Sequence, residues 1–535
     1  MTIRETVMDV IARHEHRTFL VDANTRREIT YGEFHQQSCA LAAELRRRGI
    51  RKGDRIGVML PNCCELAVVY FACIYLGAVI VPVNPGLSHG ELRFILSSCQ
   101  PALLVVGAAA ADAVKALHSN VVKLLPRDAT TRTIDRDGIA VDELHRPNAF
   151  APLDNADCDD LVLIMYTSGT TAKPKGLAHR IGSLFRNARA FALAQKIDQD
   201  ARFYLTLSMA YMGGFYNLLV LPFLCGASVV VDHVFDARSS LHFWDKAKGG
   251  RVNALWFAPT VMAILLRMDR GRSGEEFCRN SVRHTFVGFA PLSLKVKREF
   301  ESRYGVRVIE NYGLSETLFV TARSAVSFEG DSGYVGESLP GVELRIIDVD
   351  GKNVPPGAEG EVQILTPDLT AGYLDSDGNL VKMDAGQWFS TGDVGHLDER
   401  GSLSITGRKK DLIIRGGVNI SPAAIEEVLM QARGVAEVAV VSIPHELYGE
   451  DVVAVLKLEA GTTLESVLDA LVSHAKHNLA QHQQPARYIA IDEFPRTASG
   501  KIQKARIREL VAEKLQVGSR SIVAEQKTER AAVSN

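Results

Sequence analysis

The chain has 535 residues, of which 46% are hydrophobic and 23% are charged, and its 61 basic and 63 acidic residues leave a net charge of −2. A chain of this size and composition is expected to fold into two or more globular domains. The balanced charge argues against a nucleic-acid or membrane-surface partner, so an anionic ligand would need a local site.

The beginning of the chain favours a cytoplasmic protein without a membrane span. Residues 1–17 are charged throughout and lack the apolar centre of a signal peptide. Residues 66–83 (LAVVYFACIYLGAVIVPV) are just long enough to raise a membrane span. Gly77 and Pro82 interrupt this run, and its second half is rich in valine and isoleucine, which favours a buried helix followed by a core strand. The 8 cysteines form no C-x-x-C pair, as expected in a reduced compartment.

Helix and strand patterns then alternate along the chain. Thr30 and Glu33 form a capping box for a helix that continues to Arg48 and ends at Gly49. Apolar residues recur at helical spacing across residues 181–191. Short β-branched runs that predict strands lie at Val81, at Val229–Val231 and at Ile346–Ile347. This alternation predicts an α/β fold.

A loop rich in hydroxyls follows the apolar run at residues 161–165. It extends from Tyr166 to Gly176 (YTSGTTAKPKG) and lies between a predicted strand and a predicted helix. That order directs backbone N–H groups, hydroxyls and lysines towards an anion, so the loop is predicted to bind phosphate. It lacks the Walker pattern, which would need glycine at Pro174 and a hydroxyl at Gly176. Composition alone also allows a flexible loop without a ligand.

A basic turn lies at residues 407–429 (GRKKDLIIRGGVNISPAAIEEVL). A Gly-Gly turn follows its short apolar strand, and Ser421 and Pro422 are expected to begin a helix as N-cap and first helical residue. By composition alone, this turn is predicted to be a solvated surface rather than a joint between domains. The last residues, 517–535, are polar without an apolar period, which predicts a flexible tail.

Five motifs in order resemble those of the adenylate-forming (ANL) superfamily, which comprises acyl-CoA synthetases, nonribosomal adenylation domains and luciferases. They are YTSGTTAKPKG at residues 166–176, NYGLSE at Asn311–Glu316, STGD at Ser390–Asp393, Gly407-Arg408 at the start of the hinge motif, and PRTASGK at Pro495–Lys501. Together they span roughly residues 160–505. Each motif alone is moderately specific, whereas all five in this order make coincidence a poor explanation.

The resemblance implies a large N-terminal domain of α/β subdomains and a small mobile C-terminal α+β domain. We expect the acyl and ATP pockets in residues 1–408, a hinge at residues 409–410 with Lys410 at the hinge position, a lid domain at 411–516 and a flexible tail at 517–535. The basic turn is then predicted to be a domain joint, which reverses the expectation from its composition.

The family performs two steps. A carboxylate attacks the α-phosphate of ATP to give an acyl-adenylate and pyrophosphate, and a thiol then attacks the adenylate. The sequence GGVNISPAAIEE resembles acyl-CoA synthetases more than nonribosomal adenylation domains, and only a short tail follows residue 516, so coenzyme A is the expected thiol. The expected partners are ATP, Mg²⁺, coenzyme A and a carboxylic acid or acyl-adenylate, with a homodimer left open.

The resemblance also implies roles for individual residues. Lys501 would stabilise the transition state of adenylation, and Glu316 would be catalytic as the carboxylate associated with magnesium. Gly416 and Gly417 would lie beside the pantetheine arm of coenzyme A. The residues expected to bind ATP or AMP are Thr167, Ser168, Gly169, Thr170, Thr171, Lys175, Ala290, Pro291, Asn311, Tyr312, Gly313, Ser315, Asp393 and Arg408. Each charged or aromatic member also has a purely structural alternative, such as core packing, a turn or a solvated charge.

Two departures from the family pattern concern the acyl pocket, for which Tyr211, Phe215 and Phe289 are the candidate residues. Where many relatives have L-P-x-x-H, residues 207–211 are LSMAY, and where they have G-G-A-P-L or G-A-A-P-L, residues 287–292 contain Phe289 as VGFAPL. The phenyl ring could shape the acyl pocket, pack in the core or impair the nucleotide site.

Three functions follow from these patterns. The first is a complete ATP-dependent acyl-CoA synthetase, that is, an acid–thiol ligase. The second is a ligase with weakened adenylation that uses a supplied acyl-adenylate. The third is a noncatalytic binding protein, which is disfavoured because Lys501, Glu316 and the phosphate-binding loop are retained.

Overall fold

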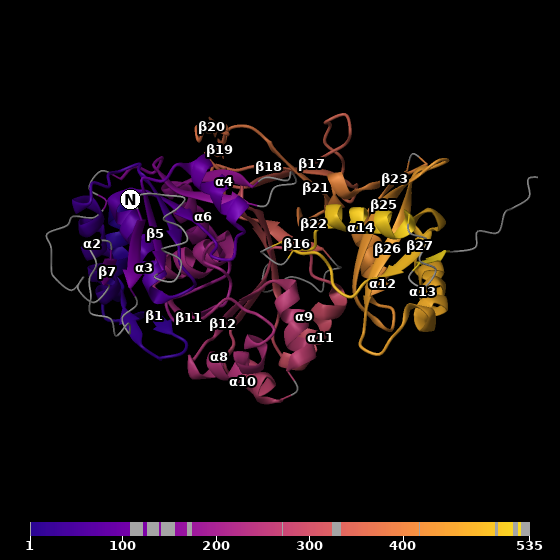
Figure 1. Cartoon of the computed structure of the whole chain (residues 1–535), viewed down its shortest axis with the longest axis horizontal. Coiled ribbons are helices and arrows are strands. Elements are labelled where there is room, and N and C mark those ends of the chain that lie inside the picture. Colours follow the sequence, from indigo (N-terminus) through magenta and orange to yellow (C-terminus); the bar gives the residue numbers. More distant parts are fainter. Residues whose placement is uncertain are drawn as a thin grey trace, which may run out of the picture.

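The computed structural model describes residues 2–107, 121–125, 138–140, 153, 156–167, 174–269, 271–323, 333–416, 418–497, 501–516 and 523–525. Within these residues, three sheets and their helices form a large domain and a small domain. Figure 1 shows the large domain in colours from indigo through magenta to orange and the small domain in orange to yellow beside it. The predicted α/β organisation with a small C-terminal domain is therefore confirmed.

The first sheet has nine strands among the described residues and contains both parallel and antiparallel pairs. In spatial order its strands are β20 (Leu380–Lys382), β19 (Gly372–Leu374), β9 (Lys175–Arg180), β8 (Leu161–Thr167), β4 (Val79–Pro82), β3 (Arg55–Met59), β5 (Leu103–Gly107), β6 (Val121–Leu125) and β7 (Gly138–Ala140).

The second sheet has thirteen described strands and joins a parallel half to an antiparallel half at β14. In spatial order its strands are β17 (Glu343–Ile347), β18 (Gly360–Leu365), β21 (Phe389–Leu397), β22 (Leu403–Arg408), β16 (Tyr334–Ser338), β15 (Leu318–Ala322), β14 (Ile309–Leu314), β13 (His284–Val287), β12 (Ala254–Phe257), β10 (Arg202–Leu205), β11 (Ser228–Val231), β1 (Thr18–Asp22) and β2 (Glu28–Thr30).

The small domain contains the third sheet, in which β25 (Val435–His445) and β26 (Gly449–Leu458) form a long antiparallel pair. Its other described strands are β24 (Val418–Ile420), β23 (Ile413–Arg415), β27 (Arg487–Ala490) and β28 (Val523–Glu525). Because β28 pairs with β27, residues 523–525 form a strand inside the segment that was predicted to be a flexible tail. The rest of that segment lies outside the described residues.

Helices cover the sheets of both domains. In the large domain they are α1 (Ile3–His14), α2 (Tyr31–Arg47), α3 (Cys64–Leu76), α4 (His89–Cys99), α6 (Ile181–Ala194), the π-helix η3 (Gly213–Val220), α7 (Leu221–Leu224), the 3₁₀ helix η4 (Ser239–His242), α8 (Phe243–Gly249), α9 (Pro259–Met268), α10 (Ser273–Ser281) and α11 (Leu294–Tyr304). After β22 come the short η5 (Lys409–Asp411), then α12 (Pro422–Met430), α13 (Leu464–Asn478), η6 (Gln481–Gln483) and α14 (Lys504–Gln516).

Several local predictions are confirmed. The capping box of Thr30 and Glu33 begins α2, and the apolar spacing across residues 181–191 forms α6. The run at residues 66–83 divides into the buried helix α3 and the core strand β4. In the described part of the chain, no helix combines the length and apolarity that crossing a membrane requires. Ser421 precedes α12 as predicted, but its hydroxyl donates to the carbonyl of Thr406 rather than capping the helix.

One hydrophobic core connects the two sheets of the large domain. Its largest cluster contains residues of both sheets and of α1, α2, α3 and α6, including Phe71 and Phe191 with no exposed surface. Five aromatic residues near the predicted acyl site are at most 4% exposed and belong to the hydrophobic core, namely Phe215, Tyr216, Trp256, Phe257 and Phe319. This burial gives the loops at the sheet edges a rigid base.

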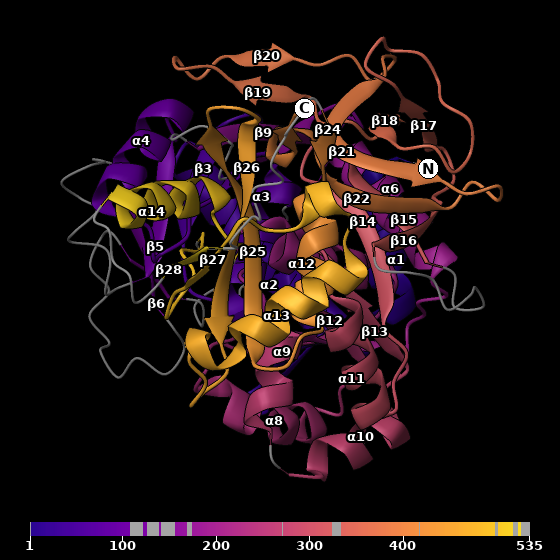
Figure 2. The ribbon, with the colours of Figure 1, turned by 90° about the vertical axis from the view of Figure 1, so that its right-hand side faces the viewer.

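The small domain contacts the large one through α12 and α11. The backbone N–H of Leu294 donates to Glu427 Oε1 at 3.2 Å, and Lys295 Nζ donates to the carbonyl of Met430 at 3.2 Å. Figure 2 views the molecule from the side of the small domain, so that α12, α13, β25 and β26 lie in front of the large domain. The two domains are therefore docked in one defined orientation.

Candidate active site

Three loops with predicted site residues meet at one edge of the thirteen-stranded sheet. The strands β10, β12, β13 and β14 are successive parallel neighbours. Residues 207–211 follow β10, residues 288–291 follow β13, and residues 311–316 belong to β14 and the turn after it. The carboxyl ends of parallel strands share one edge, which is where open α/β sheets bind ligands.

Asn311 connects β14 to the loop after β13. Its Nδ2 donates a 2.9 Å hydrogen bond to the carbonyl of Val287. A Cβ atom on Gly288 would lie only 2.9 Å from Asn311 Oδ1, so the glycine permits this close approach. The next residues, Ala290 and Pro291, are exposed. The structure thus brings three of the residues predicted to bind nucleotide onto one accessible edge.

The turn between β14 and β15 requires glycine at position 313. A Cβ atom there would lie 2.1 Å from the carbonyl oxygen of Leu318, far inside van der Waals contact. The turn is closed further by a 3.3 Å hydrogen bond from the Leu314 N–H to Thr317 Oγ1. Ser315 and Glu316 are half-buried in this turn, and the backbone therefore holds them in a narrow range of positions.

Glu316 is held by the segment that leads into β19. The Tyr373 hydroxyl donates to Glu316 Oε1 at 3.0 Å, and the Thr370 N–H donates to the Glu316 carbonyl at 2.7 Å. Lys175 Nζ lies over the Tyr373 ring, 5.7 Å from its centroid. Burial, followed by the nearby Glu316 carboxylate, raises the pKa of Tyr373, so its hydroxyl remains a donor. One tyrosine therefore links the Glu316 turn to the strand after the phosphate-binding loop.

Asp393 lies at the centre of a second polar group. It is 2% exposed, accepts a 2.6 Å hydrogen bond from the Tyr312 hydroxyl at Oδ2, and forms a 2.8 Å ion pair with Arg408 Nε at Oδ1. Asp393 and Arg408 are direct partners of the antiparallel strands β21 and β22. Because each carboxylate oxygen can accept a further hydrogen bond, Asp393 retains acceptor capacity for ligand hydroxyls.

Lys501 lies within electrostatic range of both groups. Loss of hydration in this crowded region is the largest cause that lowers the pKa of Lys501, and the positive charge of Arg408 lowers it further, whereas Asp393 and Glu316 oppose the change. Lys501 is nevertheless exposed to solvent. The small domain therefore brings its predicted catalytic lysine to the predicted nucleotide residues of the large domain.

Only the two ends of the phosphate-binding loop are described. Thr167 and Lys175 are direct partners of the antiparallel pair β8 and β9, so the loop is followed by a strand and not directly by the helix that was predicted; α6 begins only after β9, at Ile181. The predicted residues between them that lie outside the described part of the chain are Ser168, Gly169, Thr170 and Thr171.

The predicted acyl-pocket residues differ in accessibility. Phe215 has no exposed surface and its ring packs edge-on against Tyr70 at 5.2 Å, which favours a core role over a pocket wall. Tyr211 is half-buried, and its hydroxyl accepts a 3.1 Å hydrogen bond from Asn84 Nδ2. Phe289 is 36% exposed, so its ring does not pack in the core. The structure thus leaves Tyr211 and Phe289 as the accessible candidates.

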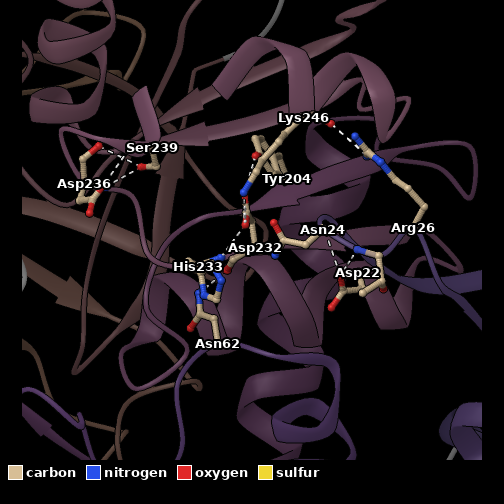
Figure 3. Close-up of polar contacts among 11 residues, drawn as sticks. Asp22, Asn24, Arg26, Asn62, Tyr204, Asp232, His233, Asp236, Ser239 and Lys246 are labelled. Atoms are coloured by element: carbon tan, nitrogen blue, oxygen red, sulfur yellow. Dashed lines mark hydrogen bonds and ion pairs between the residues drawn. The ribbon is translucent and has the colours of Figure 1, made fainter. Parts of the chain in front are cut away.

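A buried polar cluster supports the 207–211 segment (Figure 3). Asn62 donates to the carbonyls of Leu207 at 2.9 Å and Asp232 at 3.2 Å, and its Oδ1 accepts from the Met209 N–H at 2.9 Å. The Asp232 carboxylate pairs with Lys246 at 2.9 Å and accepts from the Tyr204 hydroxyl at 2.7 Å. Asn62 therefore holds the segment against the end of β11.

The predicted hinge residue and the predicted coenzyme A residues lie in neighbouring segments after β22. Lys410 is exposed in η5, between β22 and β23. Partial loss of hydration is the largest cause that lowers the pKa of Lys410. Gly416 is exposed with φ of 58°, and its N–H donates to the Tyr448 carbonyl at 2.8 Å. Its predicted neighbour, Gly417, lies outside the described residues.

Sequence reasoning missed several residues that shape this region. Tyr373 holds Glu316, Asn62 holds the 207–211 segment, and the buried Asn187 donates to the carbonyl of Phe319 and accepts from its N–H, both at 2.9 Å. Each contact joins residues far apart in the sequence, so periodicity could not reveal it. The only usable signal was the polar character of Asn62 and Asn187 inside otherwise apolar segments.

Glu316 is the predicted ligand of a magnesium ion. In the part of the chain that the structure describes, no group of three or more His, Cys, Asp and Glu residues could hold a metal by itself. Mg²⁺ usually binds through one or two carboxylates together with substrate phosphates and water. Glu316, with one oxygen bonded to Tyr373, fits such an ion arriving with ATP better than a permanent metal site.

Solved structures share this arrangement of domains. The chain superposes on ATP-bound MatB from Rhodopseudomonas palustris with a TM-score of 0.83 at 27% identity, covering 96% of this chain and 100% of that one. It matches the o-succinylbenzoate CoA synthetase MenE from Bacillus subtilis in complex with its acyl-adenylate intermediate with a TM-score of 0.77 at 26% identity, covering 94% and 98%. The fold is that of the adenylate-forming class, as the motifs predicted.

Two family models match the sequence. The model described as AMP-binding enzyme matches residues 7–374, and that described as AMP-binding enzyme C-terminal domain matches residues 424–501. The chain belongs to the AMP-binding enzyme family. It is 32% identical over 501 residues to the indoleacetate–CoA ligase of Aromatoleum aromaticum, covering 91% of this chain and 94% of that protein.

Proposed function

We propose that this protein is an AMP-forming acid–thiol ligase that converts a carboxylic acid, ATP and coenzyme A into an acyl-CoA thioester, AMP and pyrophosphate. The observation that carries the proposal is the convergence of Lys501 from the small domain with Asp393, Arg408 and Glu316 from the large domain. Family membership supports the reaction class, and the relative of 32% identity is named as a CoA ligase.

In the first step, an oxygen of the substrate carboxylate attacks the α-phosphorus of ATP and the bond to pyrophosphate breaks. Negative charge develops on the phosphate oxygens, and Lys501 is placed to stabilise it as a point charge. We propose that Asp393 accepts hydrogen bonds from the ribose hydroxyls, with Arg408 fixing its orientation, and that Tyr312 and Asn311 border the adenine. Residues 166–176 would hold the β- and γ-phosphates.

We propose that Glu316 holds the Mg²⁺ that arrives with ATP. The ion would supply positive charge to the phosphates, and the structure supports this role through the fixed position of the Glu316 side chain beside Tyr373. Lys175, above the Tyr373 ring, would lie next to the same phosphates.

In the second step, the thiol sulfur of coenzyme A attacks the acyl carbonyl carbon and AMP leaves. We propose that the small domain, residues 411–516, rotates about residues 409–410 relative to residues 1–408 to admit the thiol, with Gly416 and Gly417 beside the pantetheine arm. The exposure of Gly416 and the position of Lys410 between two sheets support this motion.

The reaction is proposed to occur in the cytoplasm. All 8 cysteines are free, and four of them, Cys39, Cys63, Cys158 and Cys225, are half-buried or exposed, which suits a reducing compartment.

Exchange of labelled pyrophosphate into ATP with a broad panel of acids tests the proposal. A complete synthetase is expected to exchange label in the presence of its acid and to form a thioester when coenzyme A is added. Thioester formation from supplied acyl-adenylates without exchange for any acid would instead indicate the ligase with weakened adenylation. Absence of both activities would contradict the proposed reaction.

A further inference from the structure

Phe289 has a backbone conformation that is unusual for a large side chain. Its φ angle is 73°, in the left-handed region that glycine adopts freely and that bulky residues rarely occupy. Such outliers persist only where the surrounding structure holds them, and they are concentrated at ligand sites. A local contact is therefore expected to stabilise this conformation of Phe289, and the position of its ring identifies that contact.

The ring is directed towards Gly213. A Cβ atom on Gly213 would lie 3.0 Å from Cζ of Phe289 and 3.2 Å from Cδ1 of Leu207. Gly213 is the first residue of the π-helix η3, a type of helix found frequently at functional sites. The absence of a side chain at Gly213 is what admits the end of the Phe289 ring between η3 and the 207–211 segment.

The opposite side of the same loop faces the predicted nucleotide residues. The Cβ direction of Gly288 points to Asn311 Oδ1, 2.9 Å away, whereas Phe289 points to Gly213. Phe289 is nevertheless 36% exposed, so its ring has a face that a ligand can contact. This geometry favours the acyl side over both the core and the nucleotide side.

We infer, on the basis of the function proposed above, that Phe289 is a specificity-determining residue whose ring, seated against Gly213, limits the acyl site to compact acids. A ring in this position occupies volume that the acyl chain of a longer acid would need. Its exposed face offers a flat apolar surface for a short or aromatic acyl group. The substrate class is therefore a compact carboxylic acid rather than a long-chain fatty acid.

The kinetic test compares the wild-type protein with Phe289→Gly and Phe289→Ala. Glycine suits a φ of 73°, so Phe289→Gly is expected to melt no lower than the wild type. For wild type, kcat/KM is expected to fall steeply from butyrate to decanoate. In Phe289→Gly, kcat/KM for decanoate relative to butyrate is expected to rise by about tenfold or more, the range that pocket volume commonly contributes. Val349→Ala, which shortens a 93% exposed apolar side chain in another part of the chain, is the control and is expected to leave the ratio unchanged.

A binding test separates this inference from the proposed reaction. Non-reactive acyl-sulfamoyl adenosines of increasing acyl length are titrated into each protein by calorimetry. The affinity of the wild type is expected to drop beyond short acyl groups, and Phe289→Gly is expected to remove that drop. This result without catalysis by the wild type would overturn the proposed reaction and support the role of Phe289. The same length dependence in the wild type and Phe289→Gly, or equal use of butyrate and decanoate by the wild type, would overturn the inference.

Discussion

At the scale of single residues, the candidate site brings the charged side chains of Lys501, Arg408, Asp393 and Glu316 into one partly desolvated region. Lys501 has a lowered pKa because burial disfavours its charged form and Arg408 repels it, even though Asp393 and Glu316 attract it. A lysine in this environment loses its proton at a lower pH than a lysine in water. Below that pH it is charged and can stabilise a phosphate transition state, and above it the charge is lost.

We predict that adenylation declines as pH rises through the lowered pKa of Lys501. Lys501→Arg keeps its charge at high pH, so its rate of pyrophosphate exchange is expected to be reduced but to lose the alkaline decline. Lys501→Ala is expected to slow exchange by about a hundredfold or more, as when one transition-state donor is removed. Thioester formation from supplied acyl-adenylate is expected to continue in both variants. If the rate of pyrophosphate exchange by Lys501→Arg declined at high pH as in the wild type, the decline would be due to another titrating group.

Tyr373 is predicted to position Glu316 for Mg–ATP. Tyr373→Phe removes the 3.0 Å hydrogen bond and keeps the ring below Lys175, so the KM for Mg–ATP in the exchange reaction is expected to rise by about tenfold, the lower range for a bond to a charged group. Tyr334→Phe is the matched control, because its hydroxyl donates a 3.1 Å bond to Glu337. If the two variants shift KM equally, Tyr373 has no special role.

At the scale of elements, the site depends on strand neighbours that lie far apart in the sequence. β9 follows the phosphate-binding loop and pairs with β19, which contains Tyr373 opposite Leu177. On the same strand, His179 is fully buried beside the backbone of Ser315, and neither ring nitrogen has a hydrogen-bond partner among the described residues. Burial lowers the pKa of His179 to about 4. A neutral imidazole therefore supports the turn that contains Glu316.

The protein is predicted to lose stability as the pH falls, because of His179. In the unfolded chain this histidine binds a proton below pH 6.5, whereas in the folded chain it does so only below about 4. The unfolded state thus gains protons first as the pH falls, which costs the native state about 3 kcal/mol across this window. Urea unfolding of the wild type and of His179→Leu between pH 7.5 and pH 4 measures this loss. The unfolding free energy of the wild type is expected to fall by about 3 kcal/mol more than that of His179→Leu over this range. A difference in unfolding free energy that does not vary with pH would contradict this prediction.

Strand and helix patterns predicted many of these elements, because local features specify them. The capping box at Thr30 and the apolar spacing at residues 181–191 produce α2 and α6 as expected. The π-helix at Gly213 and the burial of Phe215 were not predicted, since both depend on the packing of η3 against α6 and β10. Composition favoured a solvated surface at the basic turn, and Arg408, Lys409 and Lys410 are exposed there, but composition did not reveal that Lys409 pairs with Glu361 and Arg408 with Asp393.

At the scale of the whole molecule, the small domain contacts the large domain beside the predicted nucleotide residues. Glu427 and Met430 of α12 accept hydrogen bonds from the first turn of α11, which follows the Phe289 loop directly. On α11, Lys297 forms a buried 2.5 Å ion pair with Glu310, the residue before Asn311. The same helix therefore contacts the small domain and the base of the nucleotide edge.

Glu427→Gln is predicted to weaken this docked orientation. Replacing the charged acceptor of the Leu294 N–H is expected to slow pyrophosphate exchange by about fivefold, corresponding to roughly 1 kcal/mol. Thioester formation from supplied acyl-adenylate is expected to be unchanged or faster, because we propose that this step uses another orientation of the small domain. Glu465→Gln, at an exposed position on α13, is the control. Equal slowing of both steps by Glu427→Gln would contradict a role in docking.

The sequence by itself determined the class of fold and the reaction class, and it predicted most polar residues of the candidate site, because motifs such as NYGLSE and STGD combine local backbone needs with the chemistry of ATP. Only the tertiary structure decided which groups hold these residues in place. Tyr373 approaches Glu316, and Phe289 approaches Gly213, through contacts between segments separated by many residues. Such contacts arise from sheet order and domain docking, which no local pattern encodes.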